Sequence, residues 1–240
     1  MPRSHHSFNL RKSRHYSFMF VFFILAVVIA IFFISRSNAV PIETILSGLG
    51  LSFYRLVVAY LISLVVAIAV AVIVASNRNL GDSLIPLFDI MQNLPSFALI
   101  PLFAYALGYT DQMAIIFAAT SIVWPILFYL IHALTTARRD WEDAATVFGA
   151  KGIKHIWHFL LPLGFPALVT GSIVGFSIGW EAIIGIEIIG LHRGIGVFLN
   201  SSVENRPALA AGLAILLLLV LVLNRLVWMP LLKRTQLYAE

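Results

Sequence analysis

Three acidic side chains lie inside long apolar runs of the sequence, at Asp89, Glu181 and Glu187. A charge within a membrane is costly, and it usually faces a bundle interior or a water-filled path. We therefore expect Glu181, in mid-run, to face a transport pathway or a subunit interface, with a structural hydrogen-bond partner as the alternative. Trp180, directly before it, is a further pathway or gate candidate. Glu187 is the second pathway or gate candidate, although its place near the end of the run also allows it to reach the outer interface. Asp89 is close enough to the cytoplasmic end of its run to be solvated.

Gln92 and Asn93 are polar residues of a segment that prolines interrupt, and they lie shortly before Pro95. Backbone carbonyls that a proline leaves unbonded are tolerated in a membrane where they line a cavity. Both residues are therefore pathway candidates as well. The equally weighted alternative is that their side chains bond neighbouring helices.

Enzymatic chemistry has little support in the sequence. An intramembrane enzyme would have to use Asp89, Glu181 or His132, and no Ser/His/Asp arrangement accompanies them. The absence of cysteine excludes disulfides, thiolate metal sites and a cysteine nucleophile. His155 and His158 are too few to hold a metal ion, and we expect them at the level of the lipid headgroups. No catalytic or metal-binding residue is predicted.

The polar stretch 140–162 separates two apolar runs and predicts a short helix. Its start is acidic, which the positive end of a helix dipole favours, and two alanines then allow another surface to come close. A glycine follows, as is common just past a helix end. These residues are Glu142, Asp143, Ala144, Ala145 and Gly149. The pattern fits a helix that docks into a groove of another protein, or an ordinary surface helix between two spans.

The composition predicts an all-α integral membrane protein. Hydrophobic residues make up 60% of the 240-residue chain and charged residues only 11%, against about 25% charged in soluble proteins. Six apolar segments are each close to the roughly 20 residues that a span needs. Pro86, Pro95 and Pro101 should kink or break the third, and Gly171 and Gly175 should let the fifth pack closely. The predicted spans are residues 18–34, 56–75, 84–107, 112–134, 163–189 and 208–229.

The basic residues predict the orientation of these spans. With the N-terminus inside, 12 of the 16 lysines and arginines are cytoplasmic, and the four outside are Arg36, Arg55, Arg193 and Arg206. This agrees with the positive-inside rule and places both termini in the cytoplasm. Since the charges flank apolar runs, they indicate topology and not a nucleic-acid surface.

The chain divides into a basic cytoplasmic tail, residues 1–17, and a transmembrane domain, residues 18–240, with its core at 50–230 and its cytoplasmic loop at 138–162. A cleaved signal peptide is the alternative for the first span. We favour an uncleaved helix, because the apolar run is longer than the hydrophobic part of a usual signal peptide.

The central stretch also carries a recognisable motif. Asp143-Ala144-Ala145 is followed after three intervening residues by Gly149 and, after nine more, by Phe159-Leu160-Leu161-Pro162. This spacing resembles, without a gap, the cytoplasmic EAA loop of binding-protein-dependent ABC importer permeases, with aspartate for the usual glutamate and phenylalanine for the usual isoleucine. The stretches 93–102, 179–187 and 194–196 resemble the nitrate, sulfonate and taurine branch of that family.

The resemblance implies a type I ABC importer permease, with six spans and a coupling helix at about 140–148. In that family the coupling loop docks on a cytosolic ATPase dimer, here through Glu142, Asp143, Ala144, Ala145, Phe148, Gly149, Leu161 and Pro162. ATP and Mg²⁺ are then bound by the ATPase, because this chain has no G-x-x-x-x-G-K-[ST] phosphate loop.

The expected complex also contains a second permease subunit, by default an identical chain, and an external substrate-binding protein. It would import a small solute, such as a sulfonate, nitrate or a related anion, across the plasma (inner) membrane of a bacterium or archaeon, surrounded by membrane lipid. An intramembrane enzyme and a passive channel are the alternatives, and neither needs a coupling helix of this spacing.

Overall fold

The computed structural model describes residues 41–136 and 156–236, whose regular structure is entirely helical. A 3₁₀ turn covers Ser96–Leu99, and π-helical turns cover Ile156–Leu160 and Asn224–Trp228. The α-helices are α2 (Ile42–Ser76), α3 (Arg78–Gln92), α4 (Ile100–Leu107), α5 (Asp111–Thr135), α8 (Leu161–Ile189), α9 (Ile195–Ser201), α10 (Arg206–Leu223) and α11 (Met229–Gln236). The predicted first span, 18–34, lies outside the described residues.

Four helices in the described ranges are long and apolar enough to cross a membrane, and the bent pair of α3 and α4 makes up to five. The four cover Ile42–Ser76, Asp111–Thr135, His158–Ile189 and Arg206–Thr235. The prediction of an all-helical membrane protein is confirmed. The count of six remains a prediction, because the segment that would supply the remaining span is not among the described residues.

The third apolar segment is broken, as its prolines predict. The helices on either side of the break, Asn79–Gln92 and Ser96–Leu107, are bent by 85° relative to each other. Pro95 precedes the 3₁₀ turn and Pro101 lies in the first turn of α4, where its missing N–H is tolerated. Pro86 lies inside α3 without ending it.

Two boundaries of the predicted spans are wrong. The span predicted at 56–75 starts too late, since α2 begins at Ile42 and runs without interruption for 35 residues. Its early turns are held in the bundle by Ile45 and Leu49, which are buried. The gap between the predicted spans 56–75 and 84–107 shrinks to Asn77, whose side-chain oxygen accepts from the amides of Asn79 and Leu80 and caps α3.

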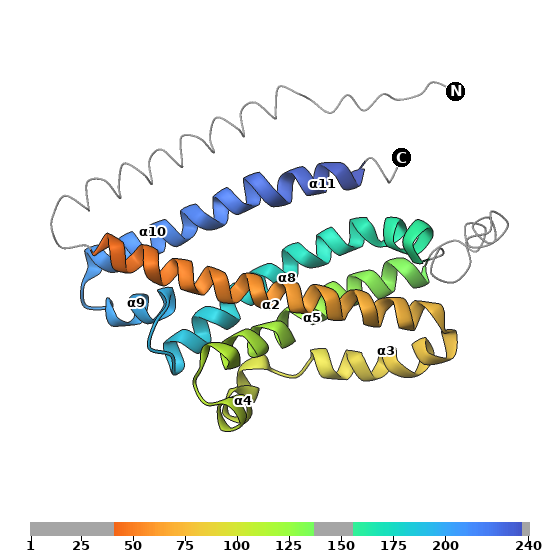
Figure 1. Ribbon diagram of the computed structural model, residues 1–240, viewed down its shortest axis with the longest axis horizontal. Helices are drawn as coiled ribbons and strands as arrows, with labels where there is room; N and C mark the ends of the chain where they lie inside the picture. The colour runs from red at the N-terminus through yellow and green to blue at the C-terminus, as the bar shows by residue number, and fades with distance from the viewer. Residues whose placement is uncertain (1–40, 137–155, 237–240) are drawn as a thin grey trace, which may run out of the picture.

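The centre of the bundle is formed by α5, which packs against both α8 and α2 (Figure 1). The approach of α8 to α5 is close because glycines face it. A Cβ built on Gly171 would lie 2.9 Å from Ile126 Cα, and one on Gly175 would lie 2.9 Å from the Ile122 carbonyl oxygen. These contacts confirm the predicted small-residue packing of this span.

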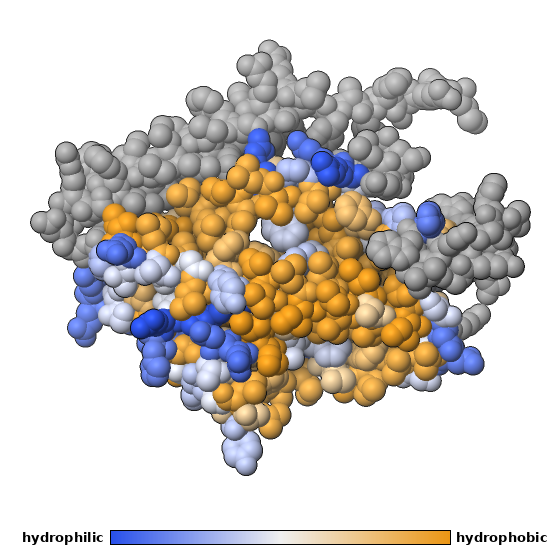
Figure 2. All heavy atoms as spheres, in the orientation of Figure 1, coloured by the Kyte–Doolittle hydropathy of each residue, from blue (hydrophilic) through white to orange (hydrophobic). Residues whose placement is uncertain are grey.

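The surface is apolar over most of the length of these helices. On the face shown in Figure 2, hydrophobic side chains form a broad field over the middle of the bundle, and hydrophilic ones lie mostly at its margins. Large apolar side chains such as Val65, Ile90 and Leu102 are more than 60% exposed. A field of this size is typical of a protein surrounded by lipid or by partner subunits.

Candidate functional site

A buried arginine joins four segments at one end of the bundle. Arg55 lies in α2, and only 2% of its side chain is exposed. Its Nη1 donates to Glu187 Oε1 at 2.6 Å and to the Arg193 carbonyl at 2.8 Å. Its Nε donates to Asp111 Oδ1 at 2.9 Å, and Nη2 bonds the same oxygen. The guanidinium therefore links α2 to α5, to α8 and to the loop before α9.

The Glu187 carboxylate is enclosed by donors. Glu187 is 1% exposed, and besides Arg55 its Oε1 accepts from Ser52 Oγ at 2.6 Å. Its Oε2 accepts from the Gly196 amide at 2.8 Å, and Ser52 Oγ in turn accepts from the Ile195 amide at 2.9 Å. A buried charge is stable only when it is paired and hydrogen-bonded in this way. The carboxylate holds the start of α9 against α2 and α8.

The Glu187 carboxylate fits against the backbone at Gly194 because a glycine has no side chain. Gly194 has φ +139°, which other residues rarely adopt, and a Cβ built there would lie 2.2 Å from Glu187 Cδ. A Cβ on Gly196 would lie 2.7 Å from the Ile184 carbonyl oxygen. The pair of glycines in the stretch 194–196 thus has a structural reason, which is the close approach of α9 to the last turns of α8.

The sequence assigned Arg55 to an outer loop, and this is wrong. An arginine directly before an apolar run is typical of a topology signal, but this one lies within α2 and is buried. The number of basic residues assigned to the predicted outer loops therefore falls from four to three. A local hint exists in Ser52, which is three positions earlier and so on the same helix face. The partners Asp111 and Glu187 are far along the chain, and only the fold brings them close.

The network lies opposite the central loop. Asp111 is in the first turn of α5 and Glu187 in the last turn of α8, whereas the segment 137–155 joins the other ends of these two helices. The end marked by Arg55, Asp111 and Glu187 is the network end of the bundle, and the other is its loop end. A 25-residue helix such as α5 separates them by about 37 Å.

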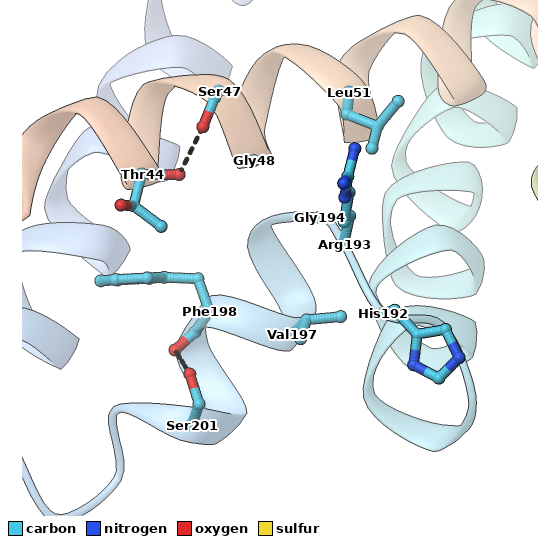
Figure 3. A pocket seen from close by; sticks show the side chains of 10 residues that line it. All are labelled: Thr44, Ser47, Gly48, Leu51, His192, Arg193, Gly194, Val197, Phe198 and Ser201. Carbon is cyan, nitrogen blue, oxygen red and sulfur yellow. Dashed lines mark hydrogen bonds between the residues drawn. The ribbon is translucent and has the colours of Figure 1, made fainter.

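A groove of about 460 Å³ lies at the network end, between the first turns of α2 and α9. In Figure 3 Arg193 extends from the loop toward Leu51 of α2, and Phe198 of α9 lies beside Thr44. His192 and Arg193 bring basic groups to the groove, and hydroxyl groups come from α2 and α9. The residues that line it are Thr44, Ser47, Gly48, Leu51, His192, Arg193, Gly194, Val197, Phe198 and Ser201.

Trp180 and Glu181, although adjacent in α8, lie in different surroundings. Trp180 is 7% exposed and stacks on Phe53 with ring centroids 6.3 Å apart. Its indole Nε1 has no hydrogen-bond partner among the described residues. Glu181 is exposed on the same stripe of α8 as Val174, Ser177 and Ile188. The expectation that Glu181 faces a path or a subunit interface stays a prediction, since the single chain holds neither.

Gln92 and Asn93 are exposed at the end of α3. The Gln92 amide donates to Asp89 Oδ1 at 2.6 Å, and the Asn93 amide donates to the Asp89 carbonyl oxygen at 2.6 Å. Both side chains thus form hydrogen bonds within the end of their own helix. Among the described residues, neither is hydrogen-bonded to Glu181 or Glu187.

Most predicted coupling residues, from Glu142 to Gly149, lie outside the described residues. Leu161 and Pro162 are described and form the first turn of α8. The π-helical turn Ile156–Leu160 runs directly into them. Within the described ranges, no group of three or more His, Asp or Glu side chains could hold a metal ion.

Comparison with known proteins gives one family. The sequence profile of the family described as "Binding-protein-dependent transport system inner membrane component" matches residues 63–229. This range covers more than half of the chain, including α5, α8 and the central stretch.

Relatives of three kinds are similar to this chain. A nitrate import permease protein of Synechocystis sp. is 26% identical over 171 residues, which are 68% of this chain and 62% of that protein. A bicarbonate transport system permease protein of Synechococcus elongatus is 29% identical over 150 residues, 62% of this chain and 54% of that one. A taurine transport system permease protein of Escherichia coli is 23% identical over 185 residues, 75% and 66% of the two chains. The match thus spans less than two thirds of each relative's length.

Proposed function

This chain belongs to the family of binding-protein-dependent transport system inner membrane components, and we propose that it is the membrane-spanning permease subunit of an ABC importer for a small anion. The observation that carries the proposal is the family match over residues 63–229. The motif of the stretch 140–162 supports it, because that spacing suits a helix that docks on an ATPase. The relatives' names, which specify nitrate, bicarbonate and taurine, support a small solute with an anionic group.

The proposed partner on the cytoplasmic side is an ATPase dimer, which binds ATP and Mg²⁺. The coupling residues are those of the motif, Glu142 to Gly149, followed by Leu161 and Pro162. The placement of the stretch supports this role, because it joins α5 to α8, and these two helices pack closely through Gly171 and Gly175. A force on the stretch would therefore act on the centre of the bundle and tilt its helices between two states.

The proposed partners on the other side and in the membrane are an external substrate-binding protein and a second permease subunit, by default an identical chain. In this orientation both termini are cytoplasmic and the network end is external. The groove at that end then presents His192 and Arg193 where an anion would arrive. Basic groups at an entrance raise the local concentration of anions, which supports the charge class of the solute.

The stripe of α8 that carries Glu181 supports a path or a subunit interface beside this helix. Glu181 has no ion-pair or hydrogen-bond partner among the described residues, and contact with lipid would be costly for its charge. A partner subunit or water beside α8 removes that cost. The proposed role of Glu181 is therefore at the boundary between the two permease subunits.

The test is co-purification from membranes with a tagged full chain. We expect a cytosolic ATPase with a phosphate-binding loop to accompany the wild-type chain and to be lost from Ala145→Arg. The control is Ser76→Arg, which adds the same charge at the exposed loop end of α2 and should retain the ATPase. Absence of an ATPase from the wild-type chain after crosslinking in membranes contradicts the proposal. Solute flux through the isolated chain without nucleotide would instead support a passive channel, and product formation by that chain an enzyme.

A further inference from the structure

A second cavity lies between α8 and the junction of α10 with α11. Its volume is about 160 Å³, which is the share of about five water molecules. The rings of Phe176, Trp180 and Trp228 form much of its wall, and Ser177 and Asn224 contribute polar groups. The cavity is thus an aromatic box with a small polar part, which suits a ligand that is itself partly apolar.

A buried donor in this wall lacks an acceptor. Trp180 lines the cavity and is 7% exposed, yet its Nε1 finds no partner among the described residues. Burying an indole N–H without an acceptor is unfavourable, and native structures seldom leave such a group unbonded. A ligand group that accepts a hydrogen bond would satisfy this nitrogen.

The polar side of the cavity comes from an irregular turn. Asn224 begins the π-helical turn Asn224–Trp228, which ends two positions before Pro230 in the helix that continues as α11. Proline cannot donate to the preceding turn, and π-helical turns inside α-helices are frequent at functional sites. The Asn224 side chain is exposed and makes no hydrogen bond to any described residue. It therefore supplies a second free donor to the cavity.

The depth of the cavity narrows the choice of ligand. Its residues 173–180 lie midway along the span His158–Ile189, and its residues 220–228 lie in the second half of the span Arg206–Thr235. Lipid carbonyls and headgroups are near the membrane surfaces and not at this depth. Ser177 belongs to both the cavity wall and the exposed stripe of Glu181. The cavity therefore opens beside the proposed path, where the acceptor would come from a solute in transit.

We propose that this cavity binds a small organic anion during transport, with the apolar body of the solute among Phe176, Trp180 and Trp228 and its oxyanion accepting from Trp180 Nε1 and the Asn224 amide. The proposal rests on the proposed importer function. Such a site favours organic over inorganic anions, because a compact inorganic anion has no apolar group to place against three aromatic rings. Neutral donors bind an anion less tightly than a buried arginine, and a transport site must also release its solute.

The experiment follows the indole N–H signals of the full chain, labelled with ¹⁵N-tryptophan in detergent micelles. The chain has five tryptophans, and Trp180→Phe assigns one signal while keeping an aromatic ring. The probe is propane-1-sulfonate, which stays charged at all working pH values. Nitrate, of equal charge, is the matched anion without an apolar body. The four other signals report whether each variant is folded.

We expect the Trp180 signal to shift saturably with propane-1-sulfonate. Nitrate should need at least a tenfold higher concentration to produce the same shift. Asn224→Leu, of similar size, should weaken propane-1-sulfonate binding about tenfold by removing one hydrogen bond to a charged group. The proposal is overturned if the Trp180 signal does not move, if nitrate is equally effective, or if all five signals drift together without saturation. An ATPase that co-purifies in spite of such a result would leave the importer function standing and reject only this site.

Discussion

The Nη1 nitrogen of Arg55 lies 2.6 Å from the Glu187 carboxylate, although 132 positions separate the two residues in the chain. Both side chains are almost fully buried, while Asp111, the other partner of the arginine, is 59% exposed. The two ion pairs therefore differ in their surroundings. The one to Glu187 is shielded from solvent and salt, and the one to Asp111 is at the rim.

Removal of one partner of the buried pair should be strongly destabilising. Arg55→Met leaves the Glu187 carboxylate without its counter-charge, and we expect a loss of about 3–5 kcal/mol in the free energy of unfolding. Asp111→Asn removes only the solvent-exposed partner and should cost about 1 kcal/mol or less. Unfolding of the detergent-solubilised chain by titration with SDS measures both.

A double variant separates pairing from packing at this site. Arg55→Met combined with Glu187→Gln removes both charges, so its cost should be clearly smaller than the sum of the two single variants. Equal destabilisation by Arg55→Met and Asp111→Asn, or strict additivity in the double variant, would show that the charges of Arg55 and Glu187 are not coupled in the free energy of unfolding.

Loss of the Ser52 hydroxyl should loosen α9 while the bundle stays folded. In Ser52→Ala the Ile195 amide loses its acceptor, and Glu187 loses one donor. An unsatisfied buried amide costs about 1–3 kcal/mol. We expect hydrogen exchange at 195–201 to be faster in Ser52→Ala than in the wild-type chain, while exchange in α5 is unchanged, as measured by mass spectrometry. Ser47→Ala, whose hydroxyl bonds only within its own exposed turn, is the control and should leave the exchange unchanged.

A side chain at Gly175 should push α8 away from α5. The Cβ of any other residue would meet the Ile122 carbonyl oxygen at 2.9 Å, and backbone cannot yield as a flexible side chain does. Gly175→Leu should therefore lower the thermal midpoint of the purified chain by an amount equivalent to about 1–3 kcal/mol. A Cβ at Gly50 meets nothing within 4 Å, so Gly50→Leu should have little effect. Equal midpoints for the two variants would contradict the packing.

Glu181 and Glu187 lie on one helix and should respond differently to loss of charge. Glu187→Gln should lower stability, because the side chain is buried among donors. Glu181→Gln should not, because Glu181 is exposed. In the proposed importer, the carboxylate of Glu181 repels an anion on the path, and its removal should raise uptake at limiting anion about fivefold at low salt. Uptake assays in proteoliposomes test this, and an unchanged rate would place Glu181 away from the path.

Gly149→Asp should uncouple ATP hydrolysis from transport in the assembled complex. In the proposed coupling loop, Gly149 would follow the end of the docking helix, and an aspartate there would add bulk and charge to the surface that docks. We expect ATPase activity to persist and to respond less to solute, while uptake falls. Normal uptake by this variant would mean that the docking surface lies elsewhere.

The sequence predicts best those features that depend on neighbours along the chain. The break at Pro95 follows from the missing N–H, and the close packing at Gly171 and Gly175 follows from their spacing on one helix face. Both are confirmed by the structure. The helix α9 lies between the predicted spans 163–189 and 208–229 and is not among the predicted helices, because seven residues in a glycine-rich stretch give little periodic signal.

The features that the sequence did not reveal depend on tertiary contacts. Arg55 has the appearance of a topology signal until α5 and α8 place Asp111 and Glu187 around it. The full length of α2 was missed for a related reason. Its first turns are held by Ser52 and Gly48 against Gly194 and Ile195, and that contact is absent from any local pattern. Glu187 is a predicted pathway or gate candidate, and the structure places it in the buried network, whose other members the sequence did not identify.

The position of the network at one end of α5 and α8 gives these helices a pivot. As long as Arg55 bonds both Asp111 and Glu187, the network ends of the two helices stay close together, and a tilt would displace chiefly their loop ends. Over the length of α5, a rotation of about 5° about this point moves the far end by about 3 Å. The buried guanidinium of Arg55 would thus be the fixed point of the rotation. The length of the helix would convert a small change in angle at this point into a displacement of atomic size at the loop end.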